Sequence, residues 1–142
     1  MNKTITLAES AGFCFGVNRA IELVNSLLDE GKKVCTLGPI IHNEQVVKKL
    51  GDRGVVIAET PDDVPPDHVL VIRSHGVPLP IYEELARRQL EIQDATCPFV
   101  SKIHSIVTKA SEKGDIILIA GNSEHPEVLG IKSRCANVAY TF

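Results

Sequence analysis

Residues 69–76 read VLVIRSHG, and this stretch sets the fold class. Val69–Ile72 is a continuous apolar run, which is typical of a strand covered by helices on both faces of a parallel sheet. His75 follows the run closely. Open α/β folds bind their ligands just beyond the carboxyl ends of the strands, so His75 is a candidate binding residue.

The same order, an apolar run and then a Cys or His, occurs at four other places in the chain. These are Thr4–Leu7 before Cys14, Val34–Leu37 before His42, Leu90–Ile92 before Cys97, and Ile116–Ala120 before His125. If all five runs are parallel strands, their Cys and His residues meet at one edge of a sheet. Two thiols and three imidazoles at one edge indicate a soft metal beside an anionic ligand.

Helical patterns alternate with the apolar runs, which predicts an α/β fold with small parallel sheets flanked by helices. Helices are expected over residues 17–29, 43–50 and 79–88 and from Pro98 to Gly114, with further strands at 54–58 and 138–142. We expect one complete three-layer domain over residues 1–95 and part of a second domain over residues 96–142. The second segment is expected to hold one helix, two strands and a loop, which is little for an independent core.

Composition narrows the class of protein. The chain has 142 residues, 44% of them hydrophobic, and a net charge of −3. This balance favours neither nucleic acid nor an anionic membrane surface as a partner, and 4% aromatic residues give few platforms for stacking bases. No apolar run approaches the roughly 20 residues of a spanning helix. We expect a cytoplasmic protein whose four cysteines are free or metal-bound.

Two of the cysteines are candidate metal ligands. Cys14 lies in AGFCFG, where glycines allow close backbone approach and a following helix N-terminus favours a thiolate. Cys97 occupies the N-cap position before Pro98, where Ser, Thr, Asp or Asn is usual. Cys35 is interpreted as a core residue, and Cys135 as more structural than functional. No Cys-x-x-Cys spacing supports a zinc ribbon.

Three histidines are candidate anion ligands. His42, His75 and His125 each lie at the end of an expected strand, and together with helix N-termini they form a plausible phosphate or diphosphate site. Glu127 is a candidate proton donor if burial or anionic neighbours favour its protonated form. His68 and His104 are interpreted as structural. A dinucleotide-binding domain is disfavoured because the opening turn has no G-x-G-x-x-G.

Five short motifs together resemble one family, 4-hydroxy-3-methylbut-2-enyl diphosphate reductase. They are AGFCFGV, LGPIIHN, RSHGVP, DATCPFV and EHPEV, and they fall in the family's order and spacing over nearly the whole chain. The resemblance implies an oxidoreductase of isoprene biosynthesis that reductively dehydroxylates an allylic diphosphate. The products are isopentenyl and dimethylallyl diphosphate, in the last step of the non-mevalonate pathway.

The resemblance also implies a cofactor and residue roles. The family holds a [4Fe–4S] cluster with three cysteines, and Cys14 and Cys97 match two of them. His42, His75 and His125 would bind the substrate diphosphate, and Glu127 would act in proton delivery. Electrons would come from a ferredoxin or flavodoxin.

The family's third cluster cysteine lies further along than this chain extends, so a truncated, weakly active or inactive form is expected. A homodimer through the partial second domain is also expected. Two other functions stay open: a non-catalytic diphosphate-binding module, and a zinc protein using Cys14, Cys97 and one His.

Overall fold

The chain folds around two separate parallel sheets, as the computed structural model shows for residues 3–136 and 139–141. The larger sheet has the strand order β2-β1-β3-β4. Its strands are β1 (Val34–Leu37), β2 (Val56–Ala58), β3 (Val69–Ile72) and β4 (Ile92–Asp94). The smaller sheet pairs β5 (Ile117–Ile119) with β6 (Ala139–Thr141). The predicted α/β fold is therefore confirmed.

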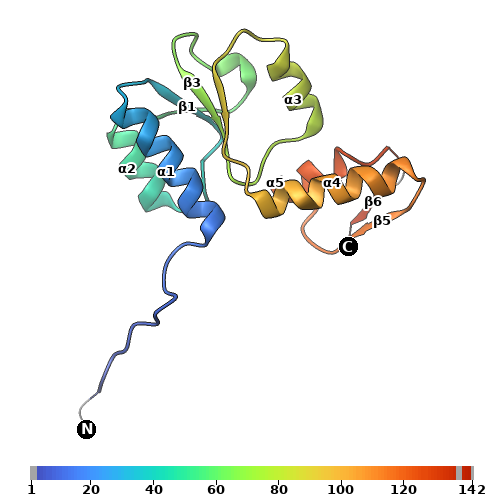
Figure 1. Ribbon diagram of the computed structural model, residues 1–142, viewed down its shortest axis with the longest axis horizontal. Helices are drawn as coiled ribbons and strands as arrows, with labels where there is room; N and C mark the ends of the chain where they lie inside the picture. Colours follow the sequence, from blue (N-terminus) through green and yellow to red (C-terminus); the bar gives the residue numbers. More distant parts are fainter. Residues whose placement is uncertain (1–2, 137–138, 142) are drawn as a thin grey trace.

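The larger sheet is the middle of three layers. Helices α1 (Phe15–Asp29) and α2 (Glu44–Asp52) cover one face, and α3 (Leu79–Ala86) covers the other (Figure 1). Alternate residues of one strand point to opposite faces. Val34 thus packs into the core beneath α1 and α2, whereas Cys35 packs into the core that includes Leu85 of α3. Covering both faces explains why every residue of β1 and β3 is buried.

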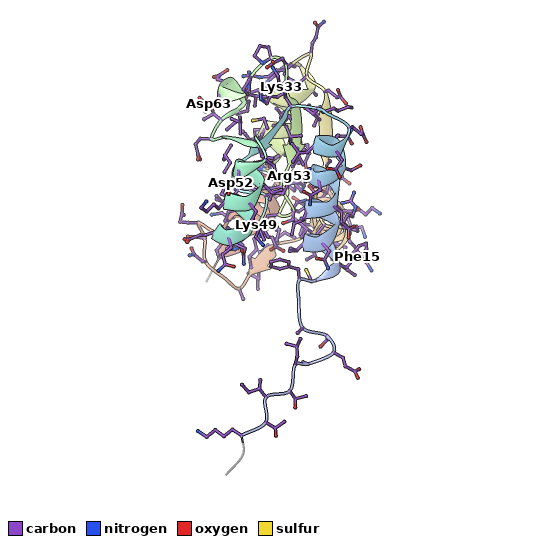
Figure 2. The ribbon with its side chains drawn as sticks, turned by 90° about the vertical axis from the view of Figure 1, so that its left-hand side faces the viewer. Phe15, Lys33, Lys49, Asp52, Arg53 and Asp63 are labelled. Carbon is purple, nitrogen blue, oxygen red and sulfur yellow. The ribbon has the colours of Figure 1, made fainter. Side chains whose placement is uncertain are left out.

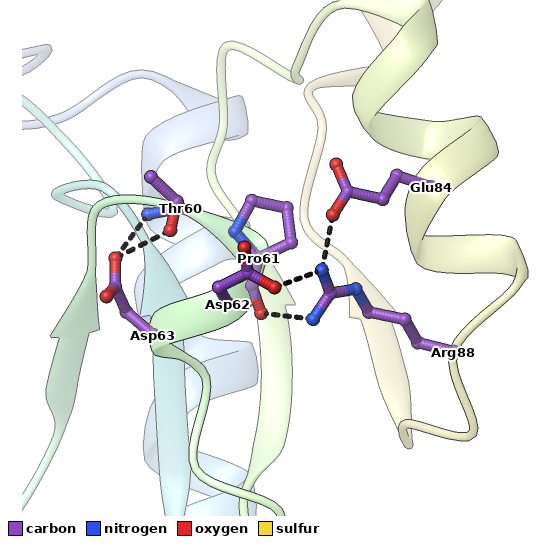
Figure 3. Close-up of polar contacts among 6 residues, drawn as sticks. All are labelled: Thr60, Pro61, Asp62, Asp63, Glu84 and Arg88. Carbon is purple, nitrogen blue, oxygen red and sulfur yellow. Dashed lines mark hydrogen bonds and ion pairs between the residues drawn. The ribbon is translucent and has the colours of Figure 1, made fainter.

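The turn-rich connector at residues 60–67 joins β2 to β3 and is fixed to α3. Its 3-10 helix η1 (Pro61–Asp63) begins with a capping box between Thr60 and Asp63. Arg88 donates to the Pro61 carbonyl oxygen at 3.0 Å and to Asp62 Oδ1 at 2.6 Å, and it also pairs with Glu84 of α3 (Figure 3). One guanidinium thus ties the connector to the helix beside it.

The part of the chain after β4 holds the smaller sheet and two helices, α4 (Pro98–Glu112) and α5 (Pro126–Lys132). A loop is predicted from the sequence where α5 lies, and this prediction is wrong. Pro126 at the first helical position, Glu127 in the first turn and Lys132 in the last turn are all favourable for a helix. The helix has seven residues, which is too short for a clear apolar period.

The predicted strand Thr4–Leu7 does not form. This segment has no strand partner, and its side chains are open to solvent, with Ile5 96% and Leu7 83% exposed. Figures 1 and 2 show it leaving the folded body next to Phe15 at the start of α1. An apolar run becomes a strand only where a neighbouring backbone accepts its hydrogen bonds, and no described strand pairs with this run.

Four other strand predictions differ in their bounds. The run at 54–58 holds β2 at Val56–Ala58, and the run Ile116–Ala120 holds β5 at Ile117–Ile119. The run Leu90–Ile92 was expected as a strand, but β4 is Ile92–Asp94. The last run was expected over residues 138–142; β6 covers Ala139–Thr141, and Val138 and Phe142 lie outside the described residues.

Candidate functional site

Three imidazoles meet beyond the carboxyl ends of the strands. The ring centroids of His42 and His75 lie 4.6 Å apart, and each lies 5.8 Å from the ring of His125. We call these three residues the imidazole triad. They come from three separate segments, after β1, after β3 and before α5, so the fold rather than the local sequence brings them together.

The loop that carries His42 is fixed to the end of β3. Ser74 donates to the Ile40 carbonyl oxygen through its backbone N–H at 3.3 Å and its hydroxyl at 3.2 Å. Gly38 has a φ of +70°, which favours glycine, and it allows the chain to turn sharply out of β1. Asn43 then caps α2 by accepting the Val46 N–H at 3.0 Å. His42 is therefore held between a fixed loop and a helix N-terminus.

His75 is a partly buried member of the imidazole triad. Its Nδ1 is buried and has no hydrogen-bond partner among the described residues. Burial, and after it the nearby His42, Arg73 and His125, together lower the pKa of His75 to about 4. At neutral pH the ring is uncharged. A buried ring nitrogen with no partner is a feature that a bound ligand would complete.

His125 is fixed by its place at the start of α5. It is the N-cap residue, and its Nδ1 accepts the backbone N–H of Glu127 at 3.3 Å. An accepting Nδ1 requires the proton of the neutral ring to be on Nε2. The local structure thus leaves an Nε2–H donor on His125 for a ligand.

Two cysteines share a cavity next to His75. The cavity has a volume of about 180 Å³ and is lined by Cys14, Gly16, Val17, Ser74, His75, Cys97, Val100 and Glu127. Cys14 is the N-cap of α1 and Cys97 the N-cap of α4, and neither side chain makes a capping hydrogen bond. Both thiols are therefore free of backbone partners at the helix ends, which suits metal ligands.

The position of Cys14 has a different cause from the one expected. The strand predicted before it is absent, so the carboxyl end of a strand does not place this residue. It is placed instead by α1, which packs its buried residues Ala20 and Val24 against the larger sheet. The close approach of α1 to α4 then brings Cys14 to the cavity that Cys97 lines.

The other two cysteines lie elsewhere. Cys35 is fully buried in β1, as expected of a core residue, and Cys135 is half-buried with its Sγ 3.6 Å from the Ile131 carbonyl oxygen. Across residues 3–136 and 139–141, no group of three or more His, Cys, Asp and Glu side chains is arranged to hold a metal ion. The zinc alternative, which needs Cys14, Cys97 and one His, stays a prediction.

Two contacts of the site were not predicted from the sequence. Gly16 lets the thiol of Cys97 approach α1, and Ser74 holds the His42 loop. Both residues lie inside the quoted motifs, Gly16 two residues after Cys14 and Ser74 directly before His75. Their closeness in the sequence to these candidates was the available signal.

Comparison with known proteins gives the family. The sequence model described as LytB protein matches residues 5–142. This chain belongs to the LytB family. Proteins named 4-hydroxy-3-methylbut-2-enyl diphosphate reductase are similar to it. The one from Thermoanaerobacter sp. (strain X514) is 46% identical over 140 residues, which cover 96% of this chain and 49% of that protein. The one from Clostridioides difficile (strain 630) is 43% identical, with 95% and 49% covered.

Solved structures agree with this LytB assignment. A structure of (E)-4-hydroxy-3-methyl-but-2-enyl diphosphate reductase, described as the terminal enzyme of the non-mevalonate pathway, matches with a TM-score of 0.81 and 39% identity, covering 96% of this chain and 50% of that one. The corresponding reductase from Plasmodium falciparum matches with a TM-score of 0.86 and 35% identity, covering 94% and 42%. The chain thus spans about half the length of the relatives it matches. In the described part of the chain, no helix is long and apolar enough to cross a membrane.

Proposed function

We propose that this chain is the substrate-binding half of a LytB-type reductase, acting on an allylic diphosphate. The observation that carries the proposal is the imidazole triad beside a cavity lined by two free thiols. The similar proteins are named 4-hydroxy-3-methylbut-2-enyl diphosphate reductase, so the same substrate is the one we propose here. The products would be isopentenyl and dimethylallyl diphosphate.

The imidazole triad supplies the groups that a diphosphate needs. His125 offers an Nε2–H donor, because its Nδ1 is occupied by the Glu127 N–H. His75 is neutral in the free protein, and a neighbouring anion would favour its protonated form. The N-terminus of α2, directly after His42, adds a positive dipole end. Binding energy from the diphosphate would position the distant allylic carbon for reaction.

Cys14 and Cys97 are proposed as two of the three thiolate ligands of a [4Fe–4S] cluster. They fit such a group because both line one cavity and neither is used as a helix cap. A bound cluster would supply electrons and a Lewis-acidic iron for the allylic hydroxyl. Glu127 lines the same cavity, and we propose that it holds the proton that the leaving hydroxyl takes up.

The remaining partners follow from the proposed reaction. Two electrons would come from a ferredoxin or flavodoxin, and the cytoplasm is the proposed compartment. We also propose two structural units, residues 1–95 and 96–142. Their boundary falls in the link between β4 and α4, and the sheets on either side share no strand. The imidazole triad draws members from both units, so ligand binding would join them.

A homodimer through the second unit is proposed from its exposed apolar surface. On α4, Phe99 is 69% and Ile106 56% exposed, and on the neighbouring strand segment Ile116 is 65% and Leu118 68% exposed. Large apolar side chains gathered on one unit favour association. A second copy of the chain carries the same surface and can cover it.

Anaerobic reconstitution with iron and sulfide tests the proposed redox role. Because the chain offers only two free thiols at the cavity, we expect far less than about four iron and four sulfide per chain. With a reduced ferredoxin as donor, we expect little turnover of the allylic diphosphate. A stable complement of about four of each, with turnover at an ordinary enzymatic rate, would show that the 142 residues are a sufficient enzyme and that our account of the ligands is wrong.

A non-catalytic diphosphate-binding module is the second candidate function. It is favoured by the same imidazole triad, which could bind an anion without a metal. Iron that binds the original chain and is lost when Cys14 and Cys97 are both replaced by serine would favour the reductase half. Diphosphate binding without any iron that depends on these cysteines would favour the module.

A further inference from the structure

His104 is a buried histidine that the proposed chemistry does not use. It lies in the middle of α4 and is 6% exposed. Its Nε2 has no hydrogen-bond partner among the described residues. Burial lowers its pKa to about 4, so the ring is a flat, uncharged group at neutral pH. A buried polar atom without a partner is costly, which suggests that the shape of the ring serves a purpose.

Two glycines lie against this ring. A Cβ atom added to Gly76 would lie 3.2 Å from His104 Cε1, and one added to Gly130 would lie 3.2 Å from His104 Nε2. Both distances are tighter than ordinary van der Waals contact. The imidazole therefore fills a slot that exists only because both neighbours lack side chains.

The two glycines belong to the segments that carry two members of the imidazole triad. Gly76 directly follows His75, and Gly130 lies in α5, whose N-cap is His125. Arg134 joins the same segments by donating to the Gly130 carbonyl oxygen at 2.5 Å and the Val77 carbonyl oxygen at 3.4 Å. The α5 helix and the turn after β3 thus meet at an interface with His104 packed into it.

We propose that His104 is a positioning residue that fixes the separation between His75 and His125 without touching the ligand. This inference rests on the proposed diphosphate site for its functional meaning. Loss of His104 should therefore change the separation between His75 and His125 and leave the separation between His42 and His75 unchanged. The His42–His75 pair should not depend on His104, because that pair is held by the hydrogen bonds from Ser74 to Ile40.

NMR on the ligand-free chain tests the geometric part. In the original protein we expect NOEs between the ring protons of His42 and His75 and between those of His75 and His125. In His104→Ala the His75–His125 NOE should disappear while the His42–His75 NOE persists. His104→Gln, which keeps most of the volume, should largely restore it. Val107→Ala, at another buried position of α4, is the control for general loosening of that helix.

Gly130 provides an independent check. Gly130→Ala places a methyl group against His104 Nε2 and should also weaken the His75–His125 NOE, and combining it with His104→Ala should relieve the crowding. Gly51→Ala is the matched control, because a Cβ at that helical glycine meets nothing within 4 Å. The inference is overturned if His104→Ala and His104→Gln leave both NOEs unchanged. It is also overturned if Val107→Ala and His104→Ala weaken both NOEs alike.

Titration with inorganic diphosphate separates this inference from the proposed function. If both hold, His104→Ala weakens diphosphate binding by about tenfold and His104→Gln by less. If the original protein binds no diphosphate while the NOEs respond as described, the proposed site is wrong but the positioning role stands. If diphosphate binds equally well to the original protein and to His104→Ala, the positioning role is wrong and the site stands.

Discussion

A Cβ atom added to Gly16 would lie 2.5 Å from the Sγ of Cys97 and 2.9 Å from its Cβ. Gly16 lies in the first turn of α1, and Cys97 is the N-cap of α4. The contact therefore brings together the starts of two helices that are far apart in the sequence. Glycine is needed here because any side chain would displace the thiol that is proposed to bind metal.

Gly16→Ala should destabilise the fold through this contact. Its methyl group would overlap the Cys97 side chain, and overpacking of this kind costs about 1–3 kcal/mol. Urea unfolding followed by circular dichroism measures the free energy of unfolding. Gly51→Ala, in the open surroundings of α2, should instead raise it by up to about 1 kcal/mol through helix propensity. Equal effects of the two variants would contradict the proposed contact.

Stability should depend on pH between about 4 and 6.5. Burial lowers the pKa values of His75 and His104 from 6.5 to about 4, so the unfolded chain binds more protons than the folded chain in this range. Above pH 6.5 the two rings are largely neutral in both states, and the stability of the fold is at its full value. As the pH falls toward 4, protonation of the unfolded chain lowers the free energy of unfolding. For His104 the loss by pH 4 is on the order of 3 kcal/mol.

The His104→Gln variant isolates the contribution of His104 to this pH dependence of stability. Its free energy of unfolding should fall less steeply between pH 6.5 and pH 4 than that of the original protein. The difference at pH 7.5, where both histidines are neutral in both states, gives the cost of altered packing alone. A slope unchanged by the substitution would show that His104 does not titrate as its burial indicates.

Local sequence predicted the parts of the fold that depend on burial. Val34–Leu37 and Val69–Ile72 are both strands with the predicted bounds, because a continuous apolar run is stable only between two covering layers. The run Thr4–Leu7 has similar composition but no pairing partner, which local sequence does not reveal. Helix α5 was missed because seven residues show little periodicity.

Part of the site could also be predicted from local sequence. Strand ends placed His42 and His75 correctly near one another, since parallel strands share an edge. The contact between Gly16 and Cys97 and the packing of Gly130 against His104 join distant segments. Such pairs depend on how the helices pack, and no spacing in the sequence specifies them.

Arg88→Ala should lower the urea midpoint by releasing the connector from α3. Arg88 binds the Pro61 carbonyl oxygen, Asp62 and Glu84, and its loss leaves the first of these without that donor (Figure 3). The loss should be smaller than for Gly16→Ala, because the guanidinium is partly open to solvent. Arg88→Lys should recover only part of it, since one ammonium cannot reproduce the forked geometry.

Arg87→Ala is the matched control for this connection. Arg87 is the adjacent, exposed arginine and makes no side-chain hydrogen bond or ion pair among the described residues. Its substitution should leave the midpoint unchanged. If both variants behaved alike, the contacts of Arg88 would contribute nothing specific.

The exposed apolar surface of α4 predicts self-association. Light scattering on a size-exclusion column should give a mass that rises toward twice 15.4 kDa as the protein concentration increases. Ile106→Glu should restore the monomer, because a charge replaces a side chain that is 56% exposed in the single chain. Ser105→Glu adds the same charge at the exposed position directly before Ile106. It should leave the concentration-dependent mass as in the original protein. A monomer at every concentration would rule out the dimer.

The central claim, that the imidazole triad binds a diphosphate, is tested most directly by calorimetric titration with inorganic diphosphate at pH 7. We expect binding at a single site with proton uptake, because the anion converts neutral His75 to its charged form, and the heat should therefore vary with the ionisation enthalpy of the buffer. His75→Asn should weaken binding by about tenfold or more and reduce the proton uptake. His68→Asn, which alters a histidine at the opposite edge of the sheet, should bind as the original protein does. No binding by the original protein, or equal binding by both variants, would contradict the account.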